Sequence, residues 1–201
     1  MVSKAFLDEL KPSFFEMTVG LAFWYFAKEE VDIAIIEVGM GGRLDSTNVI
    51  IPELSIITNI GYDHMQFLGE TLPEIAGEKA GIIKAGIPVV ISQTQAETSL
   101  VFLQKAAEMN APIIFAEDNF SISRLGEKQI GSKLLAEYQV KADSKKEILE
   151  FGLLGIYQRM NLPGILESVN QLRNQGWKIS DEALRTGLAQ VTELTGLKGR
   201  W

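Results

Sequence analysis

The sequence of 201 residues contains no cysteine, so it can form no disulfide and perform no thiol chemistry. It has no apolar run long enough to cross a membrane, and its first residues, MVSKAF, lack the apolar core of a secretory signal. A net charge of −7 and a pI near 4.9 argue against nucleic acid as a main partner. We therefore expect a cytoplasmic protein whose partners are neither membranes nor nucleic acids.

Two nucleotide-binding motifs are also absent. No segment fits G-x-x-x-x-G-K-[ST], the Walker A loop, and the glycines between Gly39 and Gly42 lack the G-x-G-x-x-G spacing of dinucleotide-binding folds. No internal repeat is present, and no linker rich in proline, glycine or serine divides the chain. Because 46% of its residues are hydrophobic, the chain can bury a core, and we expect a single domain.

Apolar runs and helix-start signals alternate in the first half of the chain. They predict strands at 32–38, 54–58, 88–92 and 112–115, and helices at 13–30, 71–84 and 96–109. Strands that alternate with helices in this way predict right-handed βαβ units and a parallel sheet. The first helix has apolar residues around most of its circumference, which predicts that it is buried on more than one face.

The pattern changes after Asp118. It then predicts antiparallel strands at 120–125, 132–141 and 148–154, turns at 126–128 and 143–146, and two closing helices at 161–175 and 181–193. The predicted fold class is therefore α/β, with a largely parallel sheet flanked by helices and a smaller antiparallel sheet in the second half.

The most informative segment runs from Glu37 to Asn48, EVGMGGRLDSTN. It follows the apolar run 33–36, so a buried strand would deliver the Glu37 carboxylate to a loop at the sheet edge where α/β enzymes usually keep their chemistry. Asp63 and His64 follow the next predicted strand, and the carboxyl ends of neighbouring strands can share a ligand. A carboxylate and an imidazole together suit Mg²⁺, or Mn²⁺ in its place.

Each candidate residue also has a plain structural interpretation. Glu37 could pair with Arg43 at the end of its strand, and the only histidine could cap or pack a helix. Lys79 could be a solvated helix lysine, although the unfavourable Gly77 and Gly81 on either side of it hint at close approach by another segment. Residue types and spacing alone favour an enzyme site and a structural loop equally.

These residues resemble the folylpolyglutamate synthase/dihydrofolate synthase family of Mur-type ligases. The similarity lies in the motif at 37–48, in Asp63-His64 followed by Leu68-Gly69, and in shorter motifs at 13–16, 78–82 and 155–161. It covers the chain from about residue 12 to residue 201. The resemblance implies a fold like the Mur ligase central domain and an ATP-dependent amide ligase that adds L-glutamate to a folate or dihydropteroate carboxylate through an acyl phosphate.

The family's site residues can be placed on this sequence. The resemblance implies that Glu37, His64 and Lys79 are catalytic and bind metal, with Lys79 carbamylated so that a cation becomes an anion. It also implies that Asp45, Ser46 and Ser13 bind the pterin substrate, and that Gln158 and Asn161 lie on the nucleotide side. ATP and Mg²⁺ are the implied cofactors, with no organic prosthetic group, and the whole protein is expected to be a monomer.

Two parts of the family pattern have no match in the sequence. The family carries a phosphate-binding loop before the position of Ser13 and a glutamate-binding domain after that of Trp201. We therefore expect residues 1–201 to form one partial central, ATP-binding domain that has no ligase turnover alone. The alternatives are a non-catalytic fragment that binds pterin or metal, and a carbamyl-lysine metal hydrolase, which the single histidine disfavours.

Overall fold

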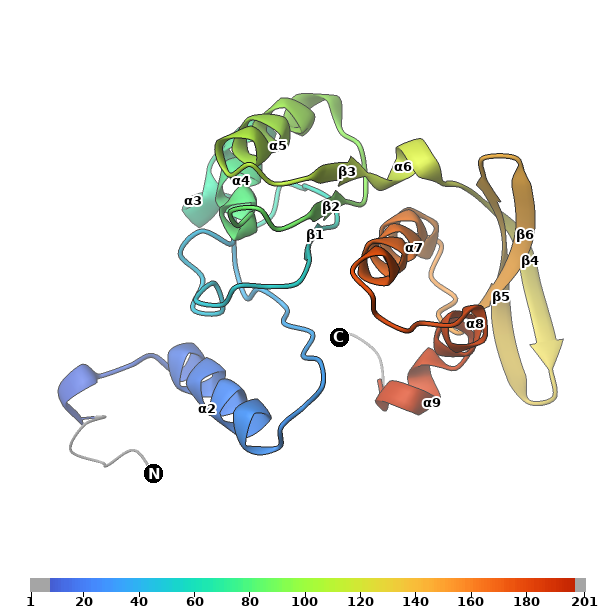
Figure 1. The fold of residues 1–201 in the computed structure, drawn as a ribbon, viewed down its shortest axis with the longest axis horizontal. Coiled ribbons are helices and arrows are strands. Elements are labelled where there is room, and N and C mark those ends of the chain that lie inside the picture. Colours follow the sequence, from blue (N-terminus) through green and yellow to red (C-terminus); the bar gives the residue numbers. More distant parts are fainter. Residues whose placement is uncertain (1–7, 198–201) are drawn as a thin grey trace.

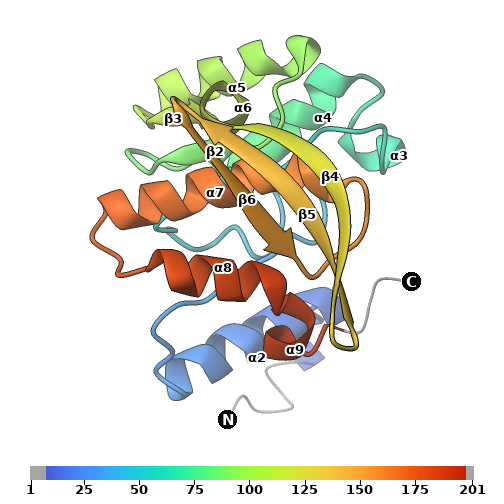
Figure 2. The ribbon, with the colours of Figure 1, turned by 90° about the vertical axis from the view of Figure 1, so that its right-hand side faces the viewer.

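A computed structural model describes residues 8–197 and confirms the α/β fold class (Figure 1). One three-stranded sheet is parallel and the other is antiparallel, and each has its own hydrophobic core. Helix α7 (Gln158–Asn174) packs against strands of both sheets (Figure 2). The two halves that the sequence predicts are therefore joined through this helix.

The parallel sheet contains three of the four predicted strands. They are β1 (Ser55–Ile57), β2 (Val89–Ile91) and β3 (Ile113–Phe115), which pair in the order β1-β2-β3. The crossovers are the predicted helices α4 (Leu72–Lys79), continued by the 3₁₀ turn η1 (Ala80–Ile82), and α5 (Ala96–Glu108). Ile75 of α4 and Phe102 of α5 are completely buried against the strands. This burial holds the end of α4 in a fixed position near the sheet.

The antiparallel sheet is confirmed, but one of its predicted turns is wrong. Its strands are β4 (Ser121–Ile130), β5 (Lys133–Ala142) and β6 (Lys145–Phe151), in that order. Strand β4 continues through the turn predicted at 126–128: Leu125 is the extra residue of a bulge, and Gly126 pairs with Glu137 of β5. The chain turns instead at Gly131, whose φ of 61° suits glycine. The other predicted turn, at 143–146, is confirmed at Asp143, but β6 already begins at Lys145, three residues before the predicted strand.

The closing helices differ from the prediction in their ends. Helix α7 begins three residues before the predicted start, and the helix predicted at 181–193 is broken at Gln190 into α8 (Asp181–Ala189) and α9 (Val191–Thr195). Two single-turn helices, α3 (Met65–Leu68) and α6 (Ala116–Asn119), carry too short a pattern for sequence prediction. No helix within residues 8–197 is both long enough and apolar enough to span a bilayer.

The strand predicted at 32–38 is wrong. The segment has no regular secondary structure, and Ile35 is 93% exposed. A strand exists only when its backbone pairs with a neighbour, and no strand among residues 8–197 pairs with this segment. The apolar run therefore lies at the surface, and Glu37 follows an irregular segment rather than a buried strand.

Helix α2 (Phe14–Lys28) is confirmed, but its predicted burial is wrong. It opens with a capping box, in which the Ser13 hydroxyl accepts from the Glu16 N–H at 3.2 Å and the Glu16 carboxylate accepts from the Ser13 N–H at 2.6 Å. Only Val19 of this helix is buried, whereas Phe14 is 82% exposed. Figure 1 shows α2 set apart from both sheets. The helical pattern predicted the local structure correctly but not what would cover it.

Candidate active site

Residues 39–48, the glycine loop, are closed by the carboxylate of Asp45. This carboxylate accepts hydrogen bonds from the backbone N–H of Met40 at 2.9 Å and of Thr47 at 2.9 Å, and from the Thr47 hydroxyl at 2.5 Å. Gly41 has a φ of 69°, which lets the backbone fold back within this short span. The loop is thus organised by its own residues.

The hydrogen bonds also favour the ionised form of Asp45. Partial burial raises the pKa of this carboxyl, but hydrogen bonds from the Thr47 side chain and from the backbone of Met40, Thr47 and Gly39 together lower the pKa below its ordinary value. Asp45 is therefore ionised at neutral pH and acts as the anionic centre of the loop. Its role in pterin binding, like that of the half-buried Ser46 beside it, stays a prediction.

We predict that Asp45→Asn destabilises the protein at neutral pH and that the deficit disappears in acid. Hydrogen bonds to the ionised form contribute stability that is complete above the unfolded-state pKa, about 3.9, and is lost as the pH falls through the lower folded-state pKa. The measurement is the difference in melting temperature between the two proteins from neutral pH to about pH 3. The exposed Asp118, changed to asparagine, is the control. A deficit that is constant across this range would show that the charge of Asp45 does not organise the loop.

The glycine loop packs on the end of helix α4. Arg43 binds Glu78 there, with its Nη2 atom 3.0 Å from the Glu78 carboxylate, so the alternative in which Arg43 pairs with Glu37 is wrong. The close approach of another segment that Gly81 suggested is confirmed, since a Cβ at this position would lie 2.3 Å from the Arg43 Cα. The close approach expected at Gly77 is wrong, because a Cβ at that position would meet nothing within 4 Å. One glycine of the pair therefore marks the contact.

The three proposed metal-binding residues lie on separate segments. Glu37 is exposed and its carboxylate has no hydrogen-bond partner in residues 8–197, while Lys79 is the half-buried last residue of α4. His64 precedes α3 with a φ of 51°, and its Nε2 atom lies 3.7 Å from the Asp63 carboxylate. The part of the chain that is described contains no cluster of three or more His, Cys, Asp or Glu side chains suited to a metal ion. Their joint role stays a prediction.

Gln95 is a positioning residue that the sequence did not predict. Its side-chain amide pairs with both backbone groups of Ile60, accepting from the N–H at 2.7 Å and donating to the C=O at 2.9 Å. Ile60 lies between β1 and His64, so this pair of bonds fixes the backbone that leads from the strand to His64. A glutamine before a helix gives no sequence signal for such a contact across 35 residues.

The residues predicted on the nucleotide side do meet. Gln158 is buried at the start of α7, and its Oε1 atom accepts a hydrogen bond from Asn161 Nδ2 at 3.0 Å. In the first turn of α7, the backbone N–H groups of Gln158 and Met160 already donate to the C=O groups of Gly155 and Tyr157. Ser13 is engaged as the N-cap of α2, which accounts for its position without a ligand. Substrate contacts for these three residues stay predictions.

The sequence profile of the Mur ligase middle domain matches residues 14–166. A dihydrofolate synthase/folylpolyglutamate synthase of Bacillus subtilis is 42% identical over 90% of this chain and 42% of its own length. A folylpolyglutamate synthase of Lacticaseibacillus casei is 36% identical over 87% of this chain and 40% of its own. A solved complex of folylpolyglutamate synthase with AMPPCP and folate superposes with a TM-score of 0.79 and 34% identity, over 92% of this chain and 47% of that one. The chain therefore spans about two fifths of the length of these two curated relatives.

Proposed function

The chain belongs to the Mur ligase family through its middle domain, and on this basis we propose that it is the central part of an ATP-dependent ligase that joins L-glutamate to a folate or dihydropteroate carboxylate. The observation that carries this proposal is the similarity, over almost the whole chain, to a synthase solved with AMPPCP and folate. AMPPCP is an analogue of ATP, and folate is the substrate that would accept glutamate. We propose that this chain takes part in binding the same two kinds of ligand. In this proposal, the phosphate-binding loop and the glutamate-binding domain of the ligase lie in the parts of the relatives that this chain does not match.

The proposed reaction has two steps. The folate carboxylate oxygen attacks the γ-phosphorus of ATP, which breaks the bond to the β-phosphate and gives an acyl phosphate and ADP. The amine of glutamate then attacks the acyl carbon, and the tetrahedral intermediate expels phosphate as the nitrogen loses a proton and the amide forms. Negative charge develops on phosphoryl oxygens in the first step, so positioned counter-charges lower its barrier.

The chain's own residues would act by placing these groups. The half-buried Asp45 and Ser46 would orient the pterin at the glycine loop, with Ser13 as a third polar contact, while Gln158 and Asn161 would orient the nucleotide at the start of α7. Holding two reactants in line replaces a bimolecular encounter by an intramolecular one, which can contribute about 7–11 kcal/mol to lowering a barrier.

In the proposed enzyme, Glu37 and His64 would hold Mg²⁺ as a partial ligand set. Both side chains are exposed and available, and Mg²⁺ is usually held by one or two protein carboxylates while phosphates and water complete the shell. When bound, Mg²⁺ would neutralise charge that develops on the phosphoryl oxygens. A carbamylated Lys79 would add a second anionic group at the end of α4. The expectations of a cytoplasmic location, a monomer and no nucleic-acid partner stay predictions.

The test is a hybrid ligase, in which this chain replaces the segment that it matches in the Bacillus subtilis relative. We predict that the hybrid releases ADP and phosphate only when a folate or dihydropteroate and glutamate are both present, and that the product gains a glutamyl residue by mass spectrometry. A folded hybrid that binds a pterin but does not turn over would support the non-catalytic alternative. A hybrid that hydrolyses other substrates without ATP would contradict both.

A further inference from the structure

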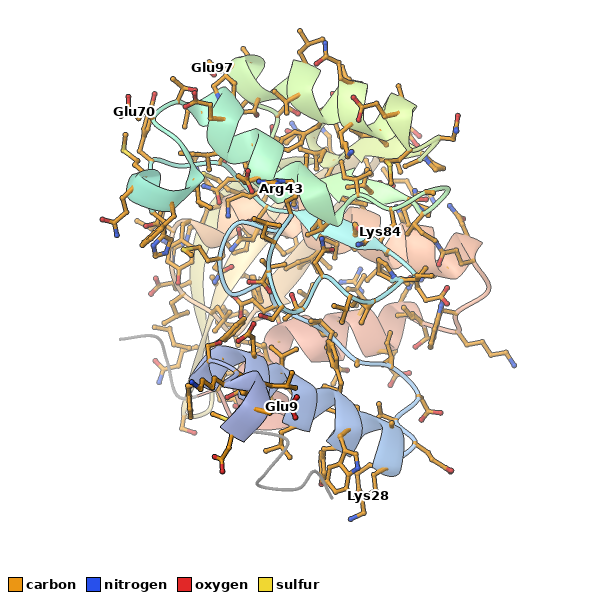
Figure 3. The ribbon with its side chains drawn as sticks, turned by 90° about the vertical axis from the view of Figure 1, so that its left-hand side faces the viewer. Glu9, Lys28, Arg43, Glu70, Lys84 and Glu97 are labelled. Carbon is orange, nitrogen blue, oxygen red and sulfur yellow. The ribbon has the colours of Figure 1, made fainter. Side chains whose placement is uncertain are left out.

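The glycine loop is held on helix α4 mainly through one pair of residues, Arg43 and Glu78 (Arg43 is labelled in Figure 3). The Arg43 Nε atom donates to both carboxylate oxygens of Glu78, at 3.1 and 3.2 Å, and Nη2 donates to one of them at 3.0 Å. The backbone N–H of Arg43 also donates to the backbone C=O of Glu78 at 2.8 Å. Because a guanidinium fork has a fixed shape, this pair sets direction as well as distance.

The exposure of the pair argues against a role in overall stability. The Arg43 side chain is 57% exposed and that of Glu78 is 26% exposed. Ion pairs that are open to solvent contribute little to the free energy of unfolding, because water and salt screen them. The geometry of the pair therefore matters more for the placement of the loop than for the stability of the fold.

Two glycines allow the backbones to meet beside this pair. A Cβ on Gly81 would lie 2.3 Å from the Cα of Arg43, and a Cβ on Gly42 would lie 2.9 Å from the C=O oxygen of Glu78 and 3.0 Å from that of Lys79. Real Cβ atoms do not approach backbone atoms so closely. Any other residue at either position would push the loop and the helix apart.

The far end of the loop is anchored to the same part of the molecule. The side-chain amide of Asn48 donates to the C=O of Gly81 at 3.0 Å and to that of Arg43 at 3.3 Å. Lys84 in turn donates from its Nζ atom to the backbone C=O of Asn48 at 3.0 Å. The loop is thus fastened at its middle and at its far end to residues 78–84, which include Lys79.

We propose that Arg43 and Glu78 are a positioning pair that sets Lys79 against the glycine loop, and so couples the groups proposed to bind the pterin to the lysine proposed to bind metal. This inference rests on the proposed function for its catalytic consequence. Lys79 follows Glu78 directly, and its carbonyl oxygen would lie 3.0 Å from a Cβ at Gly42, so a loop that moves on α4 changes the surroundings of Lys79.

The sharpest test compares two glycines of the same helical segment. Gly81→Ala places a methyl group against the Arg43 backbone, whereas Gly77→Ala, four residues earlier, meets nothing within 4 Å. In the 201-residue chain, we expect an amine-reactive reagent to label Lys79 faster in Gly81→Ala than in the unsubstituted chain, and Gly77→Ala to leave the labelling rate unchanged. Equal labelling of all three folded proteins would overturn the proposal. This measurement needs no turnover, so it is independent of the proposed function.

The kinetic test uses Arg43→Gln, Glu78→Gln and the double variant in the hybrid ligase. We expect each to lower kcat by about 10²-fold with a melting temperature close to that of the hybrid, because small displacements of reacting groups cost that much. The kcat of the double variant should be no lower than that of either single variant, because each single substitution already breaks the same contact. Arg43→Lys keeps the positive charge but not the forked guanidinium, so its kcat should lie between those of the hybrid and of Arg43→Gln. The control is Asp181→Asn, which removes the exposed pair with Arg173 elsewhere. Multiplied losses in the double variant, or losses that follow the melting temperature, would overturn the proposal.

Discussion

Glu37→Gln is expected to lower the turnover of the hybrid ligase by at least about 10²-fold while leaving its melting temperature unchanged. The size follows from the loss of a group that holds counter-charge where negative charge develops in the transition state. The unchanged melting temperature follows from the surroundings of the side chain. Glu37 is exposed, and its carboxylate makes no hydrogen bond to any residue in 8–197, so an amide of the same shape removes no folded-state contact.

The assay should be run across a range of Mg²⁺ concentrations, with Glu53→Gln as an exposed acidic control outside the site. If Glu37 binds Mg²⁺, the variant should need more Mg²⁺ and should not recover full turnover at saturation. Full activity at saturating Mg²⁺ would show that Glu37 is only a surface carboxylate. A marked fall in melting temperature would show instead that it has a structural role.

The parts of the fold that the sequence predicted correctly are those determined locally. The capping boxes that begin α2 and α4 involve residues three apart, and the strands β1 to β3 are short apolar segments of the chain. The strand expected at 32–38 failed because its apolar run says only that it can be buried, whereas pairing requires a neighbour. The same limit explains α2, whose helical period is correct and whose exposed Phe14 is not foreseen.

The candidate site divides in the same way. The motif at 37–48 identified the glycine loop, because its glycines and polar residues are contiguous. The contact of Arg43 with Glu78 joins residues 35 positions apart, and no spacing rule links them. Gly81 gave the only sequence signal for this contact, because a glycine is unfavourable in a helix unless another segment packs closely against it. Gly77, with the same signal and an open surrounding, shows that such a hint must be tested in three dimensions.

Lys79→Ala is expected to reduce the turnover of the hybrid ligase as strongly as Glu37→Gln, and short carboxylic acids should restore part of it. In the proposed enzyme, the Lys79 ammonium first loses a proton, CO₂ adds to the neutral amine as an N–C bond forms, and a second proton leaves the nitrogen, so the side chain changes from cation to anion. Lys79 is the last residue of α4, where the helix dipole favours a cation. A carbamate is therefore disfavoured there unless a metal ion or new hydrogen bonds stabilise it. We expect Lys79 to be modified only when the rest of the active site is in place.

Two measurements separate this role from that of an ordinary helix lysine. The hybrid ligase supplied with ¹³C-bicarbonate should show a carbamate signal by NMR that is absent in Lys79→Ala and in the unsubstituted 201-residue chain. Acetate or formate should raise the activity of Lys79→Ala and have no effect on Glu37→Gln, because the acid replaces the missing carbamate and cannot replace a different ligand. Lys105→Ala, which removes a solvent-accessible ion pair on α5, is the matched lysine control. If Lys79→Ala is fully active, or if the hybrid ligase turns over without any carbamate signal, Lys79 acts as an unmodified lysine and the second anionic group must come from another residue.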